Sequence, residues 1–290
     1  MSNFSAMSDA SRQPSPVLVA PLGEVSLAYL DVGSGTPIVW CHEYFGDYRS
    51  WAPQLTTFSR HFRNVTYSAR GYPGSSVPEL AAAYSQPQMV EDLDHLLDHL
   101  GIDRAIIAGL SMGGNVALNY GIAHPERCLG LVVAGCGSGS TDREGFVAKA
   151  NAMLAVIEGE GMAALHRWME KDPTRVQLKE KDPAGWAEFG RRLAEHSVLG
   201  AAHIYREVQL KRPSILSLGE QLARTAVPTL VAFGDHDAGC VDPGLFMWRA
   251  LPDARLAVLP ASGHCINLEE PELFNTLVRQ FLDDLVARRS

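Results

Sequence analysis

Three short segments of this sequence carry side chains that could act together in nucleophilic chemistry. Ser111 lies in Gly-Leu-Ser-Met-Gly-Gly at residues 109–114, Asp237 ends Gly-Asp-His-Asp, and His264 follows Gly263. A serine hydroxyl is a weak nucleophile at neutral pH unless a histidine takes its proton and a carboxylate holds the imidazole in the correct tautomer. Because all three residue types are present, the sequence predicts covalent chemistry at Ser111.

The elements on either side of Ser111 favour its exposure as a nucleophile. The apolar run Ala105–Ala108 is typical of a strand buried on both faces, and Asn115–His124 is predicted to be helical. A serine on a tight strand-to-helix turn adopts strained backbone angles, so only small neighbours fit, and the turn lifts its Oγ out of the sheet. The following N–H lies at a helix N-terminus, where developing negative charge is stabilised. In the alternative interpretation, Ser111 merely caps the helix.

In this context the chain resembles the α/β-hydrolase family, from about residue 17 to the C-terminus apart from a variable cap. In that family the nucleophile, the acid and the histidine follow one another along the chain. The resemblance implies that His264 is the base and that Asp237, at the last position of the family's GxxD pattern, is the acid. Asp235 is the rival acid.

The other polar residues near these motifs receive different interpretations. His42, His124 and His236 compete with His264 for the role of base, but His42 belongs to another loop and His124 lies at a helix end where capping explains it. Asp242 precedes Pro243 and is expected to be the N-cap of a helix that begins there.

The loop at residues 42–46 reads His-Glu-Tyr-Phe-Gly. In many family members this loop begins His-Gly, and the N–H two residues after the histidine completes the oxyanion hole. The resemblance therefore implies that the backbone N–H groups of Tyr44 and Met112 are the donors. Glu43 departs from the pattern, and a carboxylate beside the hole would oppose an oxyanion. We expect Glu43 to point outward or to be structural. Its alternative partners are a substrate cation and Arg70. Arg70 itself is expected to be a structural anchor.

Buried strands alternate with amphipathic helices along most of the chain, which predicts an α/β fold with a mostly parallel, doubly wound sheet. An antiparallel hairpin at Val17–Ala20 and Val25–Asp31 is expected to precede it. The buried strands are expected at Pro37–Cys41, Val65–Ser68, Ala105–Ala108, Leu129–Ala134, Thr229–Phe233 and Leu256–Leu259. The predicted parts are a disordered arm at residues 1–16, an α/β-hydrolase core at residues 17–139 and 221–290, and a helical cap at residues 140–220.

Large apolar side chains of the predicted cap could form the roof of a substrate pocket, although most are expected only to pack helices together. The chosen pocket residues are Glu43, Phe45, Trp168 and Trp186. Three cations near the end of the cap could recognise an anionic substrate group, but a solvated surface position is favoured for them: Arg206, Lys211 and Arg212.

Composition limits the partners and the location. The chain has 290 residues, 46% of them hydrophobic, and a formal net charge of −8. Negative charge opposes binding to the phosphates of nucleic acids and offers no polybasic patch for anionic lipid. The expected partner is therefore a small-molecule substrate, with neither nucleic acid nor membrane, and the sequence does not indicate an oligomeric state.

The five cysteines are scattered and include no CxxC pair, so they fit neither a disulfide framework nor a zinc ribbon. Reduced thiols and the lack of an evident secretory signal favour the cytoplasm. Cys41 and Cys265 are expected to be small apolar neighbours of the site and not nucleophiles.

These features predict a cofactor-independent, metal-free serine hydrolase that cleaves a small carboxylic ester or lactone through an acyl-enzyme. The hexapeptide around Ser111 is also similar to those of perhydrolases and of carbon–carbon bond hydrolases that act on meta-cleavage products, so these remain alternatives. A dehalogenase or epoxide hydrolase is disfavoured, because those relatives carry aspartate in place of this serine. An alternative of another class is a receptor-like ligand-binding homologue with little turnover.

Overall fold

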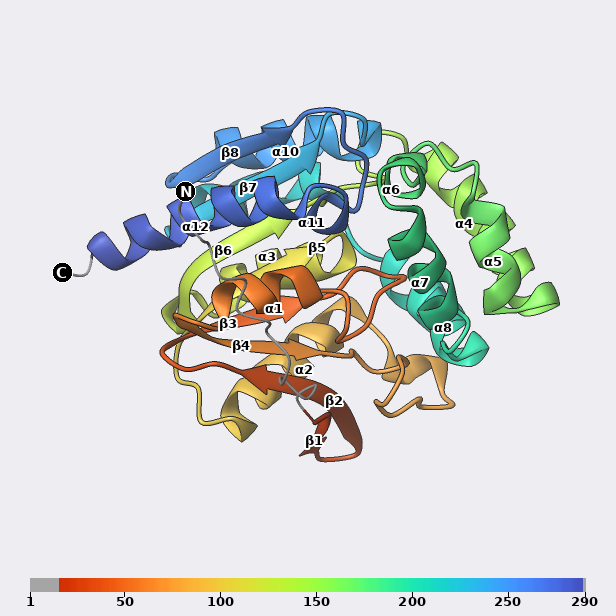
Figure 1. The fold of residues 1–290 in the computed structure, drawn as a ribbon, viewed down its shortest axis with the longest axis horizontal. Helices are drawn as coiled ribbons and strands as arrows, with labels where there is room; N and C mark the ends of the chain where they lie inside the picture. Colours follow the sequence, from red (N-terminus) through yellow and green to blue (C-terminus); the bar gives the residue numbers. More distant parts are fainter. Residues whose placement is uncertain (1–15, 289–290) are drawn as a thin grey trace, which may run out of the picture.

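Residues 16–288 are described by a computed structural model, and their strands form one eight-stranded sheet (Figure 1). The strands are β1 (Leu18–Leu22), β2 (Val25–Val32), β3 (Thr36–Cys41), β4 (Phe62–Tyr67), β5 (Ala105–Leu110), β6 (Cys128–Ala134), β7 (Thr229–Gly234) and β8 (Ala254–Leu259). Their order across the sheet is β1-β2-β4-β3-β5-β6-β7-β8. The arm predicted at residues 1–16 lies outside the described range, apart from residue 16.

The sheet is parallel from β4 to β8, whereas β2 pairs antiparallel with both β1 and β4. Every residue of β5, β6 and β7 is buried, as expected for central strands that are covered on both faces. The predicted leading hairpin and the mostly parallel, doubly wound sheet are therefore confirmed.

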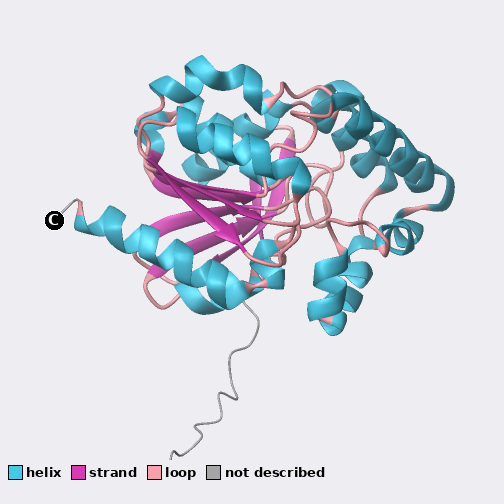
Figure 2. Cartoon of the chain, turned by 90° about the horizontal axis from the view of Figure 1, so that it is seen from above, coloured by secondary structure: helices cyan, strands magenta, loops and turns pink. Residues whose placement is uncertain are grey.

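Helices cover both faces of the sheet (Figure 2). The α-helices are α1 (Ala52–Phe58), α2 (Gln86–His99), α3 (Met112–Ala123), α4 (Arg143–Glu160), α5 (Met162–Met169), α6 (Val176–Lys181), α7 (Pro183–Leu193), α8 (Val198–His203), α9 (Gly219–Arg224), α10 (Ala238–Ala250), α11 (Ile266–Glu269) and α12 (Pro271–Ala287). The short helical turns are η1 (Ala81–Ala83), η2 (Pro125–Arg127), the π-helical η3 (Ile204–Gln209) and η4 (Ile215–Leu218). In residues 16–288, no helix is both long enough and apolar enough to cross a bilayer.

Each face of the sheet has its own apolar core. On one face, Trp40 of β3 packs against Trp51 and Phe58 beside α1, and Phe274 of α12 completes the group. On the other face, Leu93 of α2 and other apolar side chains of α2, α3 and α10 cover the central strands.

The chain between β6 and β7, all of which the structure describes, contains helices and no strand. We call residues 143–224 the helical segment. Figure 1 shows α4 to α8 gathered at one end of the sheet, away from the C-terminus of α12. The core on the α2 and α3 face continues into this segment through Met153, Leu165 and Tyr205, so the helical segment shares a hydrophobic core with the sheet.

One predicted helix start is wrong. The helix expected to begin at Pro243 is α10, which begins at Ala238 and contains Pro243 in its interior. Asp242 is therefore a residue of the helix and not its N-cap. The turn closes earlier because the Cys240 N–H donates to the backbone oxygen of Asp237 at 2.8 Å. Pro243 has no N–H to donate and its ring crowds the preceding turn, at a cost of about 3 kcal/mol that the remaining bonds and packing of α10 tolerate.

Candidate active site

Ser111 lies on the turn that joins β5 to α3, in a strained conformation. Its backbone angles are φ 57° and ψ −110°, in the left-handed region that non-glycine residues rarely adopt. Holding a residue there costs of order 1–3 kcal/mol and is a recurrent feature of functional sites. The Ser111 side chain makes no capping hydrogen bond to α3, so the interpretation of Ser111 as a simple helix cap is wrong.

The glycines around Ser111 are required by close backbone approach. A Cβ at Gly109 would collide with the backbone of Gly113, and one at Gly113 would collide with the carbonyl group of Cys41 on β3. Strand β5 pairs in parallel with β3 and β6, and this ladder fixes the turn relative to the neighbouring loops. Small residues on both sides therefore allow the chain to place Ser111 at the carboxyl end of β5.

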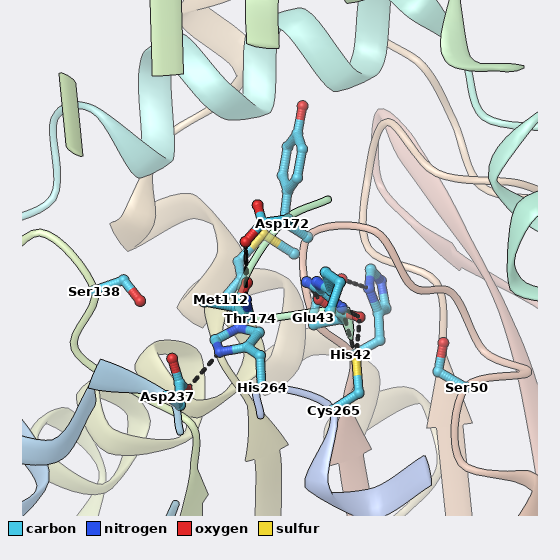
Figure 3. A network of polar contacts seen from close by, with 12 residues as sticks. His42, Glu43, Ser50, Met112, Ser138, Asp172, Thr174, Asp237, His264 and Cys265 are labelled. Atoms are coloured by element: carbon cyan, nitrogen blue, oxygen red, sulfur yellow. Dashed lines mark hydrogen bonds and ion pairs between the residues drawn. The ribbon is translucent and has the colours of Figure 1, made fainter. Parts of the chain in front are cut away.

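His264 and Asp237 are held together by a short hydrogen bond (Figure 3). His264 Nδ1 lies 2.6 Å from Asp237 Oδ2, and both side chains are buried. Burial alone would raise the pKa of Asp237, but the imidazole and its hydrogen bond outweigh burial and hold that pKa below its ordinary value. Asp235, the rival acid, is more exposed and accepts a hydrogen bond from the Ser262 N–H at 3.1 Å instead.

Backbone contacts hold the loop that carries His264. The His264 N–H donates to the Thr174 carbonyl at 3.0 Å. Glu269 accepts hydrogen bonds from the N–H groups of Gly263 at 2.6 Å and Cys265 at 2.9 Å. Burial raises the pKa of Glu269 above its ordinary value, although these N–H groups act in the opposite direction. Glu269 thereby fixes the histidine loop, a role that the sequence analysis did not predict.

The two predicted oxyanion residues are joined by Tyr72. Its hydroxyl donates to the Tyr44 carbonyl at 2.8 Å and approaches Met112 Sδ at 3.6 Å. Among residues 16–288, the backbone N–H groups of Tyr44 and Met112 have no hydrogen-bond acceptor. Two free donors beside Ser111 are suited to an incoming oxygen that carries negative charge.

His42 shapes the loop and is buried away from proton transfer. The Ala69 N–H donates to its Nε2 at 3.0 Å, so its proton lies on Nδ1, which donates to the Glu43 carbonyl at 2.6 Å. Burial lowers the pKa of His42 to about 4, so the ring is neutral at pH 7. This placement confirms the interpretation that His42 has a separate loop role.

Glu43 does not point outward. It is 3% exposed and forms a two-pronged ion pair with Arg175, at the start of α6, with 2.7 Å between Arg175 Nη1 and Glu43 Oε1. Burial would raise the pKa of Glu43, but Arg175 outweighs it and lowers the pKa to about 2. Cys265 completes the cluster, because its thiol contacts both charged groups. The structural alternative is therefore the one observed, with a partner that sequence reasoning missed.

Arg70, the alternative partner of Glu43, lies elsewhere. It pairs with the buried Asp92 at 2.5 Å and donates to the Ala83 carbonyl, as expected for a structural anchor. Arg175 itself stacks over the rings of Phe45 and Phe189, at 5.2 and 5.7 Å from their centres. No signal in the sequence pairs residues 43 and 175, because they are 132 positions apart.

Ser111 and His264 line one cavity of about 110 Å³. Glu43, Tyr44 and Phe45 line its lower part, as predicted for Glu43 and Phe45. The helical segment closes it from above with Phe146, Met153, Asp172, Arg175, Tyr205 and Arg212.

The predicted pocket residues Trp168 and Trp186 are not among those that line this cavity. Trp186 stacks on Phe189 at 5.5 Å and on His166 at 4.5 Å, and Trp168 packs at the edge of the core. Helical spacing shows which residues are apolar but not which side of a packed helix meets a cavity, and this explains both errors.

The three cations at the end of the segment also differ from one another. Arg206 and Lys211 are partly exposed and pair with Glu158 and Glu207, as a solvated surface requires. For Arg212 the surface interpretation is wrong, because its side chain is buried and lines the cavity.

Asp237, Cys240 and His264 also place potential metal ligands within 4.8 Å of one another. The Nδ1 atom of His264 is already bonded to Asp237, and burial raises the pKa of the Cys240 thiol well above its ordinary value. The bond between His264 and Asp237 already uses two of the three groups, so the cluster fits a hydrogen-bonded pair better than a metal centre.

A strained serine at the carboxyl edge of a mostly parallel sheet, with a histidine–aspartate pair across the same cavity, defines the class as a serine hydrolase. The chain belongs to the alpha/beta hydrolase family, whose model matches residues 33–277. The predicted fold and hydrolase class are thereby confirmed.

Named relatives fit this class. The chain is 29% identical to 3-oxoadipate enol-lactonase 1 of Acinetobacter baylyi, over 86% of this chain and 89% of that protein. It is 27% identical to a 2-hydroxy-6-oxononadienedioate/2-hydroxy-6-oxononatrienedioate hydrolase of Paraburkholderia xenovorans, over 97% and 99% of the two chains. The crystal structure of an enol-lactonase from Burkholderia xenovorans superposes with a TM-score of 0.81 at 25% identity, covering 92% of this chain and all of that one.

Proposed function

We propose that this protein hydrolyses a small carboxylic ester or lactone, with Ser111, His264 and Asp237 as nucleophile, base and acid. The observation that carries the proposal is the 2.6 Å bond between His264 and Asp237, with the imidazole and Ser111 lining one cavity. The similarity to enol-lactonases supports the substrate class.

In the acylation step, Ser111 Oγ attacks the substrate carbonyl and its proton passes to His264 Nε2. The positive imidazolium is stabilised by the Asp237 carboxylate, which remains ionised because its pKa is held low. His264 then gives the proton to the leaving alkoxide. In a lactone the released hydroxyl stays attached to the acyl chain.

The tetrahedral intermediate places negative charge on the former carbonyl oxygen. The free N–H groups of Tyr44 and Met112 are the proposed donors, and one such donor typically contributes a factor of roughly 10²–10³ in turnover. Arg175 neutralises the nearby Glu43, so this carboxylate does not oppose the oxyanion as an unpaired charge would. Water activated by His264 completes the reaction by hydrolysing the acyl-enzyme. These side chains supply every proton and charge, so the proposed mechanism needs no cofactor.

We further propose that residues 140–220, the predicted cap, which make up most of the helical segment, cover the substrate. Met153 and Tyr205 support this role because they line the cavity above Ser111. A cytoplasmic location is also proposed, supported by five free and buried cysteines.

The nucleophile is tested with p-nitrophenyl acetate and butyrate. The Ser111→Ala variant is expected to lose at least about 10⁴-fold in kcat, because the attacking oxygen is absent. A fluorophosphonate should label the wild-type protein at Ser111, as mapped by mass spectrometry. Equal rates in both proteins would reject the mechanism and leave a binding protein as the better interpretation. Labelling at another serine would reject Ser111 as the nucleophile.

Carbon–carbon bond hydrolysis is the second candidate, and the similarity to the Paraburkholderia xenovorans hydrolase favours it. The same three residues would serve that reaction. Turnover of a ring-fission product without turnover of simple esters would replace the first candidate with this one.

A further inference from the structure

Arg212 differs from the other cations of the cavity because it has no acidic partner. Lys149 pairs with Asp172 at 2.6 Å, and Arg175 pairs with Glu43. Across the described range, 16–288, no carboxylate forms an ion pair with Arg212. The charges that line the cavity thus leave one positive charge uncompensated, on the guanidinium of Arg212.

The guanidinium is buried and only partly satisfied. Arg212 is 8% exposed, and its Nη2 donates to the Ser138 carbonyl at 3.0 Å. Its Nη1 is fully buried and has no hydrogen-bond partner within the described residues. Burial lowers the pKa of Arg212 below its ordinary value, yet a guanidinium stays protonated at neutral pH. A buried charge of this kind is costly until a counter-ion pairs with it.

The backbone places Arg212 at the cavity that holds Ser111. The π-helical turn η3 precedes it, and Tyr205 and Gln209 of that turn line the same cavity. The Arg212 N–H donates to the Val208 carbonyl at 2.9 Å, which continues the helical path from η3. Turns of this type occur frequently at functional sites, because the extra residue redirects the side chains that follow.

We propose that Arg212 binds a carboxylate of the substrate, so that the preferred substrates are esters or lactones that carry a carboxylate group. This inference rests on the proposed hydrolysis at Ser111 and specifies the substrate class of the same cavity. The carboxylate accepts a hydrogen bond from Nη1 and supplies the missing negative charge. A purely structural role for Arg212 accounts for the Ser138 contact and for the Phe146 ring, 5.8 Å from the guanidinium carbon, but leaves Nη1 without an acceptor.

The carboxylate can belong to the acyl part or to the alcohol part of the substrate, and two matched pairs of esters distinguish these cases. Monomethyl succinate and methyl butyrate differ by a carboxylate at the end of the acyl chain. O-acetylglycolate and ethyl acetate differ by a carboxylate on the alcohol. Hydrolysis is followed by titration of the released acid, and each variant gives a ratio of kcat/KM between the charged and the neutral ester.

Arg212→Met is expected to lower this ratio roughly 10–100-fold for at least one pair, the loss typical of a hydrogen bond to a charged group. Arg212→Lys should lose less, since it keeps the charge but not the planar donor geometry. Arg206→Met is the matched control, because Arg206 is a partly exposed arginine of the same segment that pairs with Glu158. Its ratio should stay within about 2-fold of the wild-type ratio. A ratio within one variant is independent of how much of the protein is folded.

Unchanged ratios in Arg212→Met for both pairs would overturn the inference while leaving the hydrolase intact. If the wild-type protein turns over no ester, calorimetry on Ser111→Ala decides the matter without catalysis. In that background, Arg212→Met should weaken the binding of monomethyl succinate or O-acetylglycolate at least about 10-fold. Equal affinities for both ligands with and without Arg212 would reject the carboxylate site. Failure of the ester assays with a clear binding difference would instead reject only the proposed reaction.

Discussion

The loops at the carboxyl ends of the strands and the helical segment over them line the same cavity, but different interactions hold the two regions in place. In the first region, the loops that carry Ser111, Asp237 and His264 follow strands β5, β7 and β8. The hydrogen bonds between the strands set the spacing of these loops. In the helical segment, Arg175 and Arg212 reach the cavity from helix ends. An ion pair and ring contacts hold Arg175, and a hydrogen bond to the Ser138 carbonyl holds Arg212.

This difference separates the reaction from the choice of substrate. Backbone hydrogen bonds place the reacting groups, so these groups depend little on the identity of the residues above them. Side-chain pairs place the groups of the helical segment, so a few substitutions there can alter the cavity without disturbing the sheet. We therefore expect substitutions in the loops that follow the strands to change turnover, and substitutions in the helical segment to change stability and selectivity.

The largest expected effect is at Asp237. Asp237→Asn should lower kcat for p-nitrophenyl butyrate by about 10⁴-fold, because an amide cannot hold the imidazole in the required tautomer or stabilise its charged form. The matched control is Asp235→Asn, since Asp235 contacts the Ser262 N–H and not His264. Steady-state kinetics on both variants decides between the two acids. A larger loss in Asp235→Asn would assign the acid to Asp235.

A smaller effect, on stability, is expected at the pair that links the two regions. The pKa of Glu43 is about 2 in the folded protein, below its ordinary value of 4.5, so its contribution is complete above pH 5 and is lost as the pH falls towards 2. Glu43→Gln leaves Arg175 buried without a partner and should lower the free energy of unfolding at pH 7 by about 3 kcal/mol. It should also reduce the acid slope by up to about 1.4 kcal/mol per pH unit.

Urea unfolding between pH 3 and pH 8 measures both changes. Glu158→Gln serves as control, because the pair of Glu158 with Arg206 is partly exposed and should contribute far less. If both variants show the same loss and the same acid slope, the buried pair is not a special link between the sheet edge and the helical segment.

The smallest expected effect is on chain-length preference. Met153→Ala enlarges the cavity from the side of α4 and should raise the kcat/KM for p-nitrophenyl hexanoate relative to the acetate by roughly 10-fold. Trp168→Ala removes more atoms from the same segment but does not touch the cavity, so its ratio should remain close to that of the wild-type protein. An equal change in both variants would show that the segment acts through general loosening.

Sequence reasoning succeeded where a role is encoded locally. The small residues around Ser111 indicate a strained turn, because no larger side chains fit beside it. The alternation of strands and helices predicts a mostly parallel sheet, but the order of its strands comes only from the structure. The sequence alone does not decide whether Asp237 or Asp235 bonds to His264, because the two aspartates are only two positions apart and equally charged.

Long-range pairing was beyond the reach of the sequence. Glu43 and Arg175 meet only after the helical segment folds over the sheet, and an arginine such as Arg212 has the same local appearance as its exposed neighbour Arg206. Trp168 and Trp186 were misplaced for the same reason. Burial and partner choice in the segment depend on how several short helices pack, and hydrophobic spacing does not record that packing.

The ion pair between Glu43 and Arg175 also limits how a substrate reaches the serine. Pulling α6 away from the sheet would strand two charges in an apolar setting, at a cost of about 3–5 kcal/mol, so such an open form would be scarce. The other ion pair at the cavity, between Lys149 of α4 and Asp172, has a half-exposed lysine and should contribute less. We therefore expect α6 to stay in place over the sheet during turnover, so that a movement of α4 costs less than a movement of α6.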